Sequence, residues 1–393
     1  MELVAALERK GAEIIPHTFD FTPGAVEIER QKHAPAPHVI FMSPPHRPEG
    51  WYENQHTLLL TMWESSELAL EHLTTVPMFD TIMVPSRQNL EMFGRLNPNT
   101  HLFNLGCDYD TWSIREHTMS DPFTIICAGK GGRRKGIDLA IRVFKRFRTD
   151  IAALGYPKPR LIIKSGVSLG TPDKDIIILN DDLSAEDEAD LYAQAHVCLA
   201  LSRGEGWGMI PHQTIAQGKP TILTDAHGHA EFAKYGIGIP WSLVKAETEI
   251  VGRSGDWWEP DEDAAFSALL DVFNNYEAHS KRARENAEGI RSLTWDLAAE
   301  KILAQLPEKP NFTPGKWVEA PQLRLSLRVT KPISCNIGAG EYKFLPGTEY
   351  NVSADVKRVL YDAGYVDPSC IDPFEKAVFS QPRTPNIDEG FAA

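Results

Sequence analysis

Short apolar runs alternate with amphipathic stretches of helical period along residues 2–306, and this alternation restricts the fold more than any other feature of the chain. Apolar runs of about four to eight residues between glycine, proline or polar residues are typical of buried strands, whereas apolar residues three and four apart are typical of helices. Strands that alternate with helices form parallel sheets, because each return to the next parallel strand requires a crossover. The sequence therefore predicts an α/β protein built on parallel sheets.

The predicted elements fall into two groups with a break near 115–121. The first group has helices at 2–10 and 87–94 and strands at 12–16, 37–42, 58–61 and 81–84. The second group has strands at 123–128, 160–164, 176–179, 196–201 and 221–223, and helices at 137–148, 184–195, 209–217 and, with an interruption at 292–295, 262–306. A chain of 393 residues is too long for one core. We therefore expect two doubly wound domains, 1–118 and 119–306, that face each other across a cleft.

The residues after 306 differ in composition from those before. Prolines at 307, 310, 314 and 321 indicate a linker at 307–321. A small β-rich module is expected at 322–370, followed by a loose proline-rich tail at 371–393. The elements predicted within the module are strands at 323–329 and 341–344 and a helix at 352–363.

Composition excludes some classes of protein and weighs against others. No apolar run is long enough for a membrane span, and the N-terminus lacks the pattern of a signal peptide. The five cysteines have no metal-binding spacing, so we expect a reducing, cytoplasmic location. A net charge of −14 argues against a purely electrostatic grip on nucleic acid, although residues 130–135 and 142–148 are locally basic.

A glycine-flanked acid follows the predicted strand at 196–201 and precedes the predicted helix at 209–217. Free backbone N–H groups and the positive end of a helix make such a turn suitable for anions, and Gly206 and Gly208 allow a ligand to approach the backbone. Glu205 repels phosphate and suits hydroxyl groups as an acceptor. Phosphate and polyol together indicate a nucleotide sugar.

A second turn, Gly129-Lys130-Gly131-Gly132-Arg133-Arg134-Lys135-Gly136, follows the strand at 123–128. Its glycines permit close approach, and its lysines supply charge for phosphate. The spacing is not that of a P-loop. A solvated basic loop is the alternative, but ligands of doubly wound sheets bind at the carboxyl ends of strands, where this turn lies.

In this order, the two turns resemble glycosyltransferase family 4, whose GT-B fold has two Rossmann-like domains with the donor in the cleft between them. The resemblance covers about residues 2–306, and a phage-encoded member is one form that it suggests. Further matching segments are Val84-Pro85-Ser86, Gly106-Cys107-Asp108-Tyr109-Asp110-Thr111-Trp112, Gly218-Lys219-Pro220, Thr224-Asp225-Ala226-His227-Gly228-His229-Ala230-Glu231 and Leu293-Thr294-Trp295.

The resemblance implies roles for individual residues. Lys130 and Lys135 would hold the donor diphosphate, and Glu205, the first acid of the family's E-x7-E motif, would bind hydroxyls of the donor sugar. Contacts to sugar and phosphate are implied for the backbone of Gly206, Trp207, Gly208 and Met209. Glu205→Ala is expected to abolish turnover at a nearly unchanged melting temperature, and a large loss of stability would mark Glu205 as structural.

The chain departs from the family pattern at two points. The second acid of the E-x7-E motif, which binds the ribose hydroxyls, is Gln213 here, so one acceptor oxygen replaces a carboxylate. The family has a strand and a glycine-rich loop before the helix that 3–11 resembles, and this sequence begins inside the helix. We therefore expect that first strand to be missing from the first sheet.

Candidates from the first domain complete the expected site. The family often places a histidine in the cleft, and His46 is the candidate, ahead of His38, with a surface position as the alternative for both. Trp63-Glu64 is a further cleft candidate, although Trp63 suits a core equally well. Trp257-Trp258-Glu259 is expected to pack near the seam between the domains.

These expectations favour a retaining glycosyltransferase that moves a sugar from a nucleotide-sugar donor to a hydroxyl acceptor. The resemblance implies transfer on the front face of the sugar, with cations holding the diphosphate and with no metal or other cofactor. One alternative is a phage-type enzyme acting on hydroxymethylated bases of DNA, because the C-terminal module loosely resembles modules of phage-encoded proteins. Another alternative is a binding or assembly protein that keeps the fold without catalysis. The sequence leaves the oligomeric state open.

Overall fold

The first sheet has four parallel strands in the order β1-β3-β4-β5. They are β1 (His38–Met42), β3 (His56–Leu60), β4 (Thr81–Val84) and β5 (Thr100–Leu102), and α4 (Arg87–Gly94) follows β4. The computed structural model describes residues 2–15, 36–42, 50–68, 72, 75–116, 118–120, 122–130, 132–165, 173–246, 255–308, 312–313, 315–319, 325–337, 340–352 and 354–371. Strands β3 and β4 are buried almost throughout, as expected for central strands of a sheet covered on both faces.

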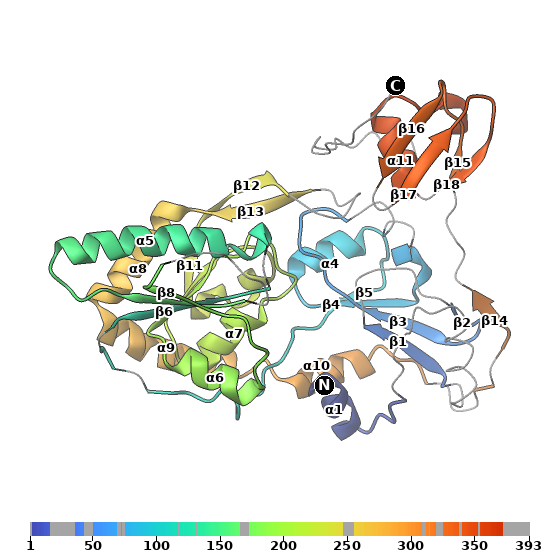
Figure 1. Ribbon diagram of the computed structural model, residues 1–393. Coiled ribbons are helices and arrows are strands. Elements are labelled where there is room, and N and C mark those ends of the chain that lie inside the picture. The colour runs from blue at the N-terminus through green and yellow to red at the C-terminus, as the bar shows by residue number, and fades with distance from the viewer. Residues whose placement is uncertain are drawn as a thin grey trace.

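The second sheet has six parallel strands in the order β11-β10-β9-β6-β7-β8. Its strands are β6 (Thr124–Ala128), β7 (Arg160–Lys164), β8 (Ile176–Leu179), β9 (Val197–Ala200), β10 (Thr221–Thr224) and β11 (Ile237–Ile239). Its helices are α5 (Ile137–Ala153), α6 (Ala185–Ala193), α7 (Met209–Ala216), α8 (Glu262–Asn274) and α9 (Tyr276–Ile290). Both sheets appear in Figure 1, the second on the left and the first on the right.

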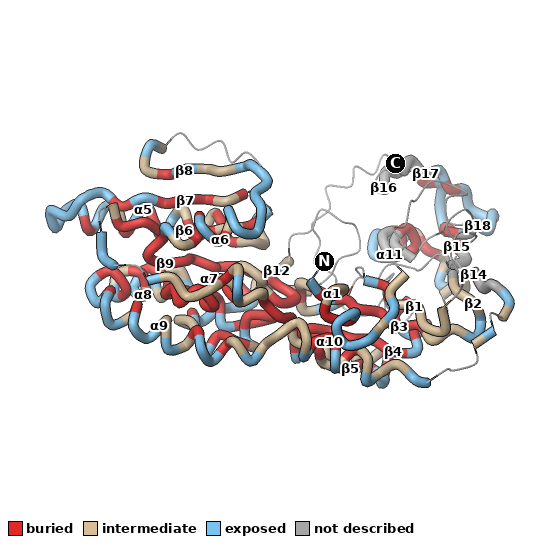
Figure 2. Tube along the Cα trace, turned by 90° about the horizontal axis from the view of Figure 1, so that it is seen from below, coloured by how far each residue is buried: buried red, intermediate tan, exposed pale blue. Residues whose placement is uncertain are grey.

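Helices cover both faces of the second sheet. On one face, α5 and α8 pack on strand residues such as Ile125 and Cys127. On the other face, α6 and α7 pack on the alternate residues, such as Ile126 and Cys198. Successive side chains of a strand point to opposite faces, so the apolar runs of the sequence supply both cores. Figure 2 shows central strands such as β7 and β9 largely in red, whereas the edge strand β8 is only partly buried.

Two segments cross between the sheets and lie against each other. A Cβ on Gly106, in the outgoing segment, would lie 2.0 Å from the backbone nitrogen of Trp295 in the returning segment. Beyond this contact, α10 (Trp295–Leu303) packs beside α1 (Glu2–Arg9) (Figure 1). Two exposed ion pairs join these helices, Arg9–Asp296 and Lys10–Glu300.

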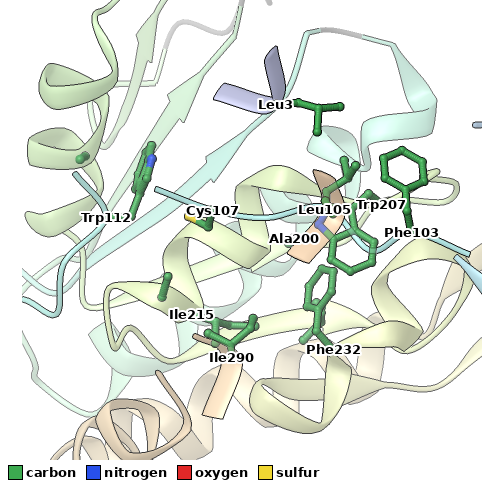
Figure 3. Packing of buried hydrophobic residues seen from close by; sticks show 14 of the residues in the cluster. Leu3, Phe103, Leu105, Cys107, Trp112, Ala200, Trp207, Ile215, Phe232 and Ile290 are labelled. Carbon is green, nitrogen blue, oxygen red and sulfur yellow. The ribbon is translucent and has the colours of Figure 1, made fainter. Parts of the chain in front are cut away.

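One hydrophobic core runs through both halves at this crossing. It includes Leu58 and Met83 from the first sheet, Ala200 from the second sheet and Ile215 from α7. Figure 3 shows Trp207 and Phe232 of the second half packed with Leu105 of the outgoing segment. The crossing is therefore a packed junction, and its geometry is fixed by side chains of both halves.

The chain leaves this body through a strand that pairs with the first half. Strand β14 (Trp317–Glu319) pairs antiparallel with β2 (Gly50–Tyr52). The module beyond it contains β15 (Leu325–Leu327), β16 (Ile333–Ile337), β17 (Gly340–Phe344), β18 (Tyr350–Val352) and α11 (Ala354–Asp362). It has its own core, which includes Leu327, Phe344 and Leu360. Part of the predicted linker thus forms a strand and anchors the module.

The structure confirms the α/β class and most predicted elements, corrects one prediction and adds strands that the sequence did not predict. Residues 12–15 form no strand: they follow the helix end at Gly11, and Ala12 and Ile14 pack onto the core instead. The hairpin of β12 (Trp241–Lys245) and β13 (Asp256–Pro260) was not predicted. Among the helices that the structure describes, none has the length and apolar character that a bilayer crossing requires. The domain boundaries stay a prediction.

Candidate functional site

Two loops meet at the carboxyl ends of the neighbouring strands β6 and β9. The loop after β6 carries Lys130 and Lys135, and the loop after β9 carries Glu205. Gly136 holds the loops together: its φ is +67°, and a Cβ on it would lie 1.8 Å from the carbonyl oxygen of Leu201. Only glycine accepts both the left-handed backbone and this close approach. The sheet order thus produces the pairing of turns that the sequence predicted.

Glu205 is buried between two cations. Lys135 Nζ lies 2.7 Å from Oε1, and Arg134 Nη1 lies 3.4 Å from Oε2. The side chain of Glu205 is only 8% exposed. Burial alone raises the pKa of this carboxyl, but Lys135 and Arg134 outweigh burial and hold the pKa at about 2. The carboxylate is therefore ionised at neutral pH and can only accept hydrogen bonds.

The same cluster lies on the seam between the two halves. Arg134 Nη1 is 3.0 Å from Oε1 of Glu64, which follows β3 of the first sheet. A Cβ on Gly204 would lie 2.0 Å from the carbonyl oxygen of Glu64, and one on Gly206 would lie 2.4 Å from Cβ of Met62. The glycines around Glu205 thus allow direct contact between the halves. Arg134 joins one acid from each half.

Arg203 fixes the turn that carries Arg134. Its guanidinium is almost fully buried and contacts Asp138, at 2.7 and 2.8 Å, and Glu259. It also donates to the carbonyl oxygen of Arg133, while its own backbone N–H donates to the carbonyl oxygen of Arg134 at 2.7 Å. A buried arginine with two carboxylates is satisfied on every side, so Arg203 has a structural role. It holds the 3-10 turn Arg133–Lys135 against the loop of Glu205.

Two buried histidines lie beneath this loop. His227 has a φ of +43°, and its Nε2 lies 3.1 Å from the carbonyl oxygen of Ser202. The ring of His229 lies directly against Gly208, whose φ is +104°. Burial lowers the pKa of His227 to about 4 and the pKa of His229 well below its ordinary value. Both rings are therefore neutral at pH 7.

The remaining residues predicted from the second half lie around the start of α7. Trp207 is fully buried. Gly208, Met209 and Gln213 are partly exposed. Lys130 is exposed on its loop. The structure therefore gathers Lys135, Glu205 and the 206–209 turn at one place.

The first-half candidates have different outcomes. His46 lies outside the described residues and stays a prediction. Trp63 is core: it is 5% exposed, and its Nε1 donates to the hydroxyl of Ser65 at 2.9 Å. Its neighbour Glu64 contributes to the seam through Arg134. Trp257 packs against Gly204 at the seam, as expected.

Sequence reasoning quoted several site residues without giving them a role. Arg134 stands among four cations of one loop, and nothing local distinguishes it from Arg133. His212 lies within the predicted helix at 209–217, and Arg203 stands two residues after the predicted strand at 196–201, where an arginine near an acid was the available signal for a paired charge. The partners that give these residues roles are distant in sequence.

Comparison with known protein families decides the identity of this site. The family described as "Family 4 Glycosyltransferase in conflict systems" matches residues 86–302, which is more than half of the chain. The chain belongs to this family. The match includes both loops, the histidine pair and both crossing segments, and it confirms the expected family.

Individual relatives agree with this assignment. A protein named as a glycosyltransferase in Sulfolobus islandicus filamentous virus (isolate Iceland/Hveragerdi) is 40% identical over 99 residues, 23% of this chain and 29% of that protein. Mannosylfructose-phosphate synthase of Agrobacterium fabrum (strain C58 / ATCC 33970) is 24% identical over 230 residues, 52% of this chain and 46% of the synthase. The chain thus spans less than half the length of these curated relatives.

Solved structures show the fold. Sucrose-phosphate synthase from Thermosynechococcus elongatus superimposes with a TM-score of 0.54 at 15% identity, over 77% of this chain and 90% of that chain. A trehalose-6-phosphate protein of E. coli bound with UDP-2-fluoro glucose superimposes with a TM-score of 0.51 at 10% identity, over 66% and 69%. The fold of this glycosyltransferase family member is GT-B, with two Rossmann-like domains, as expected.

Proposed function

We propose that the chain is a retaining glycosyltransferase that moves a sugar from a nucleotide-sugar donor to a hydroxyl acceptor. The observation that carries the proposal is Glu205, an ionised acid held between Lys135 and Arg134 on the seam of two Rossmann-like domains. An acid beside cations offers hydroxyl acceptors next to phosphate ligands, which is the combination that a sugar diphosphate needs. Family membership supports the same activity.

The proposed roles follow the chemistry of each group. Lys130 and Lys135 hold the donor diphosphate, and Glu205 accepts hydrogen bonds from hydroxyls of the donor sugar. The N–H groups at the start of α7 add a positive helix end for the diphosphate. The sugar and phosphate contact the backbone of Gly206, Trp207, Gly208 and Met209. His46 keeps its proposed place near the reacting sugar.

The proposed reaction needs no enzyme nucleophile. The bond between the sugar C1 and the diphosphate oxygen breaks, and the acceptor oxygen forms the new bond to C1 on the same face. The acceptor proton passes to a phosphate oxygen of the leaving group. Cations beside that oxygen stabilise its developing charge, so we propose that transfer requires no added metal. A chelator is then expected to leave the rate unchanged.

Gln213 bears on which nucleotide the site accepts. Its amide offers one acceptor oxygen where the family pattern has a carboxylate, so ribose hydroxyls gain one charge-free acceptor and two donors. We propose that the site discriminates less strongly between donor nucleotides than between donor sugars. A Gln213→Glu variant is expected to lower the KM for the nucleotide-sugar donor that the wild-type protein uses, and an unchanged KM would contradict this role.

The experiment that tests the activity incubates the full chain with a panel of nucleotide sugars and follows nucleotide release. Release from at least one donor is expected, with Glu205→Gln as the matched control that keeps the shape and loses the charge. If the protein neither binds nor hydrolyses any donor of the panel, the enzyme proposal is overturned and a binding or assembly role is favoured.

The acceptor is tested in the same assay. A viral relative fits a virus-encoded enzyme, and the alternative acceptor proposed for such an enzyme is a hydroxymethylated base of DNA. Duplex DNA with and without hydroxymethylated bases is added with the active donor. A mass increase only for the hydroxymethylated duplex supports this alternative, and no increase for either duplex removes it. The cytoplasmic location stays a prediction.

A further inference from the structure

Three side chains form a hydrogen-bonded relay behind the donor loop, which is the loop after β9 that carries Glu205. Trp207 Nε1 donates to Nδ1 of His212 at 3.1 Å, and Nε2 of His212 lies 3.1 Å from the hydroxyl of Tyr109. That hydroxyl lies 2.6 Å from the carbonyl oxygen of Ile290 and 2.8 Å from that of Leu293. Trp207 and His212 are fully buried, so water does not compete for these bonds.

Donor and acceptor chemistry gives the relay one direction. An indole N–H can only donate, so Nδ1 of His212 carries no proton and Nε2 carries it. Nε2–H then donates to the oxygen of Tyr109, and the hydroxyl proton of Tyr109 is left for the carbonyl oxygens of Ile290 and Leu293. Every donor has an acceptor, and the neutral ring satisfies both of its nitrogens. Burial, which lowers the pKa of His212 to about 3, agrees with this neutral form.

The far end of the relay reaches both segments that cross between the domains. Tyr109 lies in the outgoing segment, just after Gly106. Ile290 ends α9, and Leu293 leads into the returning helix α10. Since Gly106 touches the backbone of Trp295, the relay and this contact together join the two crossings at one point.

The near end of the relay lies between the residues proposed to hold the donor. Trp207 follows Gly206 and precedes Gly208, and Glu205 is two positions before it. Its indole packs against Phe232 and the ring of His212 (Figure 3 shows Trp207 and Phe232). A change in the position of this ring would therefore move the backbone of Gly206 and Gly208, and with it the carboxylate of Glu205.

We propose that His212 is a positioning residue that couples the docking of the two domains to the geometry of the donor loop. The inference rests on the proposed function, because it assigns His212 to the site of that reaction. His212 and Tyr109 contact no reacting atom; they act through Trp207. The donor loop reaches its productive geometry only while the crossings are held by Tyr109.

The kinetic test uses a matched pair of hydroxyl deletions. Tyr109→Phe removes the link to both crossings, and Tyr192→Phe removes another hydroxyl, which donates to Glu188 at 2.8 Å within α6 and away from the site. Tyr109→Phe is expected to lower kcat/KM for the donor about tenfold, as the loss of one buried hydrogen bond implies. Tyr192→Phe is expected to stay within about twofold of wild type.

Variants of the ring separate positioning from folding. His212→Asn keeps an acceptor near Nδ1 for Trp207, whereas His212→Leu removes both links. His212→Asn keeps the bond to Trp207 but cannot reach Tyr109, so its activity is expected to lie above that of His212→Leu and no higher than that of Tyr109→Phe. Adding Tyr109→Phe to His212→Leu is expected to cause no further loss, because the relay is already broken. Additive losses would overturn the coupling.

A spectroscopic readout tests the relay without turnover. In protein labelled with ¹⁵N-tryptophan, the indole N–H signal of Trp207 is identified by its absence in Trp207→Phe. That signal is expected to shift in Tyr109→Phe and in His212→Asn and to stay in place in Tyr192→Phe. No shift in Tyr109→Phe would overturn the inference, whatever the activity. Wild-type protein that uses no donor would contradict the proposed function alone, and the indole shift would still decide the relay.

Discussion

Glu205 illustrates how the behaviour of one carboxylate is set by residues far away in the chain. Its cations, Lys135 and Arg134, stand about 70 positions earlier and reach it because β6 and β9 are neighbours in the sheet. Burial without these cations would neutralise the acid. With them, the carboxylate stays charged at a buried site and can bind hydroxyl groups.

The first prediction compares two changes at Glu205. Glu205→Gln is expected to reduce turnover roughly 10- to 100-fold, because a charged acceptor becomes a neutral one. Glu205→Ala is expected to lose turnover and also about 3 kcal/mol of unfolding free energy, since Lys135 loses its acid in a largely buried site while Arg134 retains its pair with Glu64. This prediction differs from the nearly unchanged melting temperature expected from the sequence, because the structure pairs Glu205 with Lys135 and Arg134. Urea denaturation of both variants is the measurement, and equal stability of Ala and wild type would contradict it.

The second prediction concerns pH and the buried ring of His212. Its folded pKa of about 3 lies below the ordinary value near 6.5, so the unfolded chain binds more protons between these values. Stability therefore rises with pH across this window and falls as pH is lowered below about 6.5. The slope for one such group approaches about 1.4 kcal/mol per pH unit.

The measurement is urea denaturation at pH 7, 6 and 5 for wild type and His212→Asn. The asparagine variant has no titrating ring at position 212, so its unfolding free energy is expected to fall less steeply than that of wild type as the pH is lowered. His227 is also buried and neutral, with a pKa of about 4, and it remains in both proteins. Identical slopes would show that His212 is not the group responsible.

At the scale of elements, the sequence predicts strands and helices whose signals are local and misses those whose partners are distant. The central strands β6 and β9 are apolar without interruption and were predicted, as was the interruption before α10. Strands β2 and β14 are three residues each and exist only because they pair across the chain. Residues 12–15 looked like a strand and pack onto the core as an irregular segment.

The site follows the same rule. The two glycine-rich turns were predicted from local composition, and the sheet order brings them together. The seam contact of Glu64, the buried pairs of Arg203 and the relay through His212 each depend on a tertiary neighbour. No spacing along the chain indicates such a neighbour, so sequence alone identified the loops but not what holds them.

The third prediction tests the contact that holds the two loops together. Gly136→Ala and Gly155→Ala both place a Cβ on a left-handed backbone, at φ +67° and +82°. A Cβ at 155 meets nothing within 4 Å, whereas one at 136 meets the carbonyl oxygen of Leu201. Gly155→Ala is expected to cost only the backbone strain, about 1–2 kcal/mol.

Gly136→Ala is expected to cost clearly more, because the loop of Glu205 must also move away. Its donor KM is expected to rise, while that of Gly155→Ala stays at the wild-type value. Urea denaturation and donor kinetics on the pair provide the comparison. Equal losses of stability in both variants would show that the contact between loops contributes nothing.

At the scale of the whole molecule, the two domains are joined in one core and the C-terminal module is attached to only one of them. Leu58 and Ile215 belong to the same hydrophobic cluster, so the crossing is rigid. The module has a separate core and follows β14, which pairs with β2 of the first domain (Figure 1). The module is therefore tethered to the first half through β2, which is not part of the sheet that carries the loops of Lys135 and Glu205.

The last prediction tests this tether. Asn54 accepts from the backbone N–H of Gly315 at 2.8 Å and donates to the carbonyl oxygen of Thr313 at 2.5 Å, and Glu53 N–H donates to the carbonyl oxygen of Lys316 at 2.9 Å. Asn54→Ala removes the two side-chain bonds and leaves both cores intact. Trypsin cleavage after Lys316 is expected to accelerate, because a protease binds its substrate as an extended segment that is not paired with another strand and the variant holds residues 313–316 less firmly.

Donor turnover by Asn54→Ala is expected to match wild type, since none of the loops at β6 and β9 changes. The control is Asn275→Ala, which removes an exposed amide bonded to Asp271 at the start of α9 and leaves β14 in place. Cleavage after Lys316 at the wild-type rate in Asn54→Ala would show that the strand pair alone holds the tether. Loss of donor turnover would show that the tether also supports the site across the first domain.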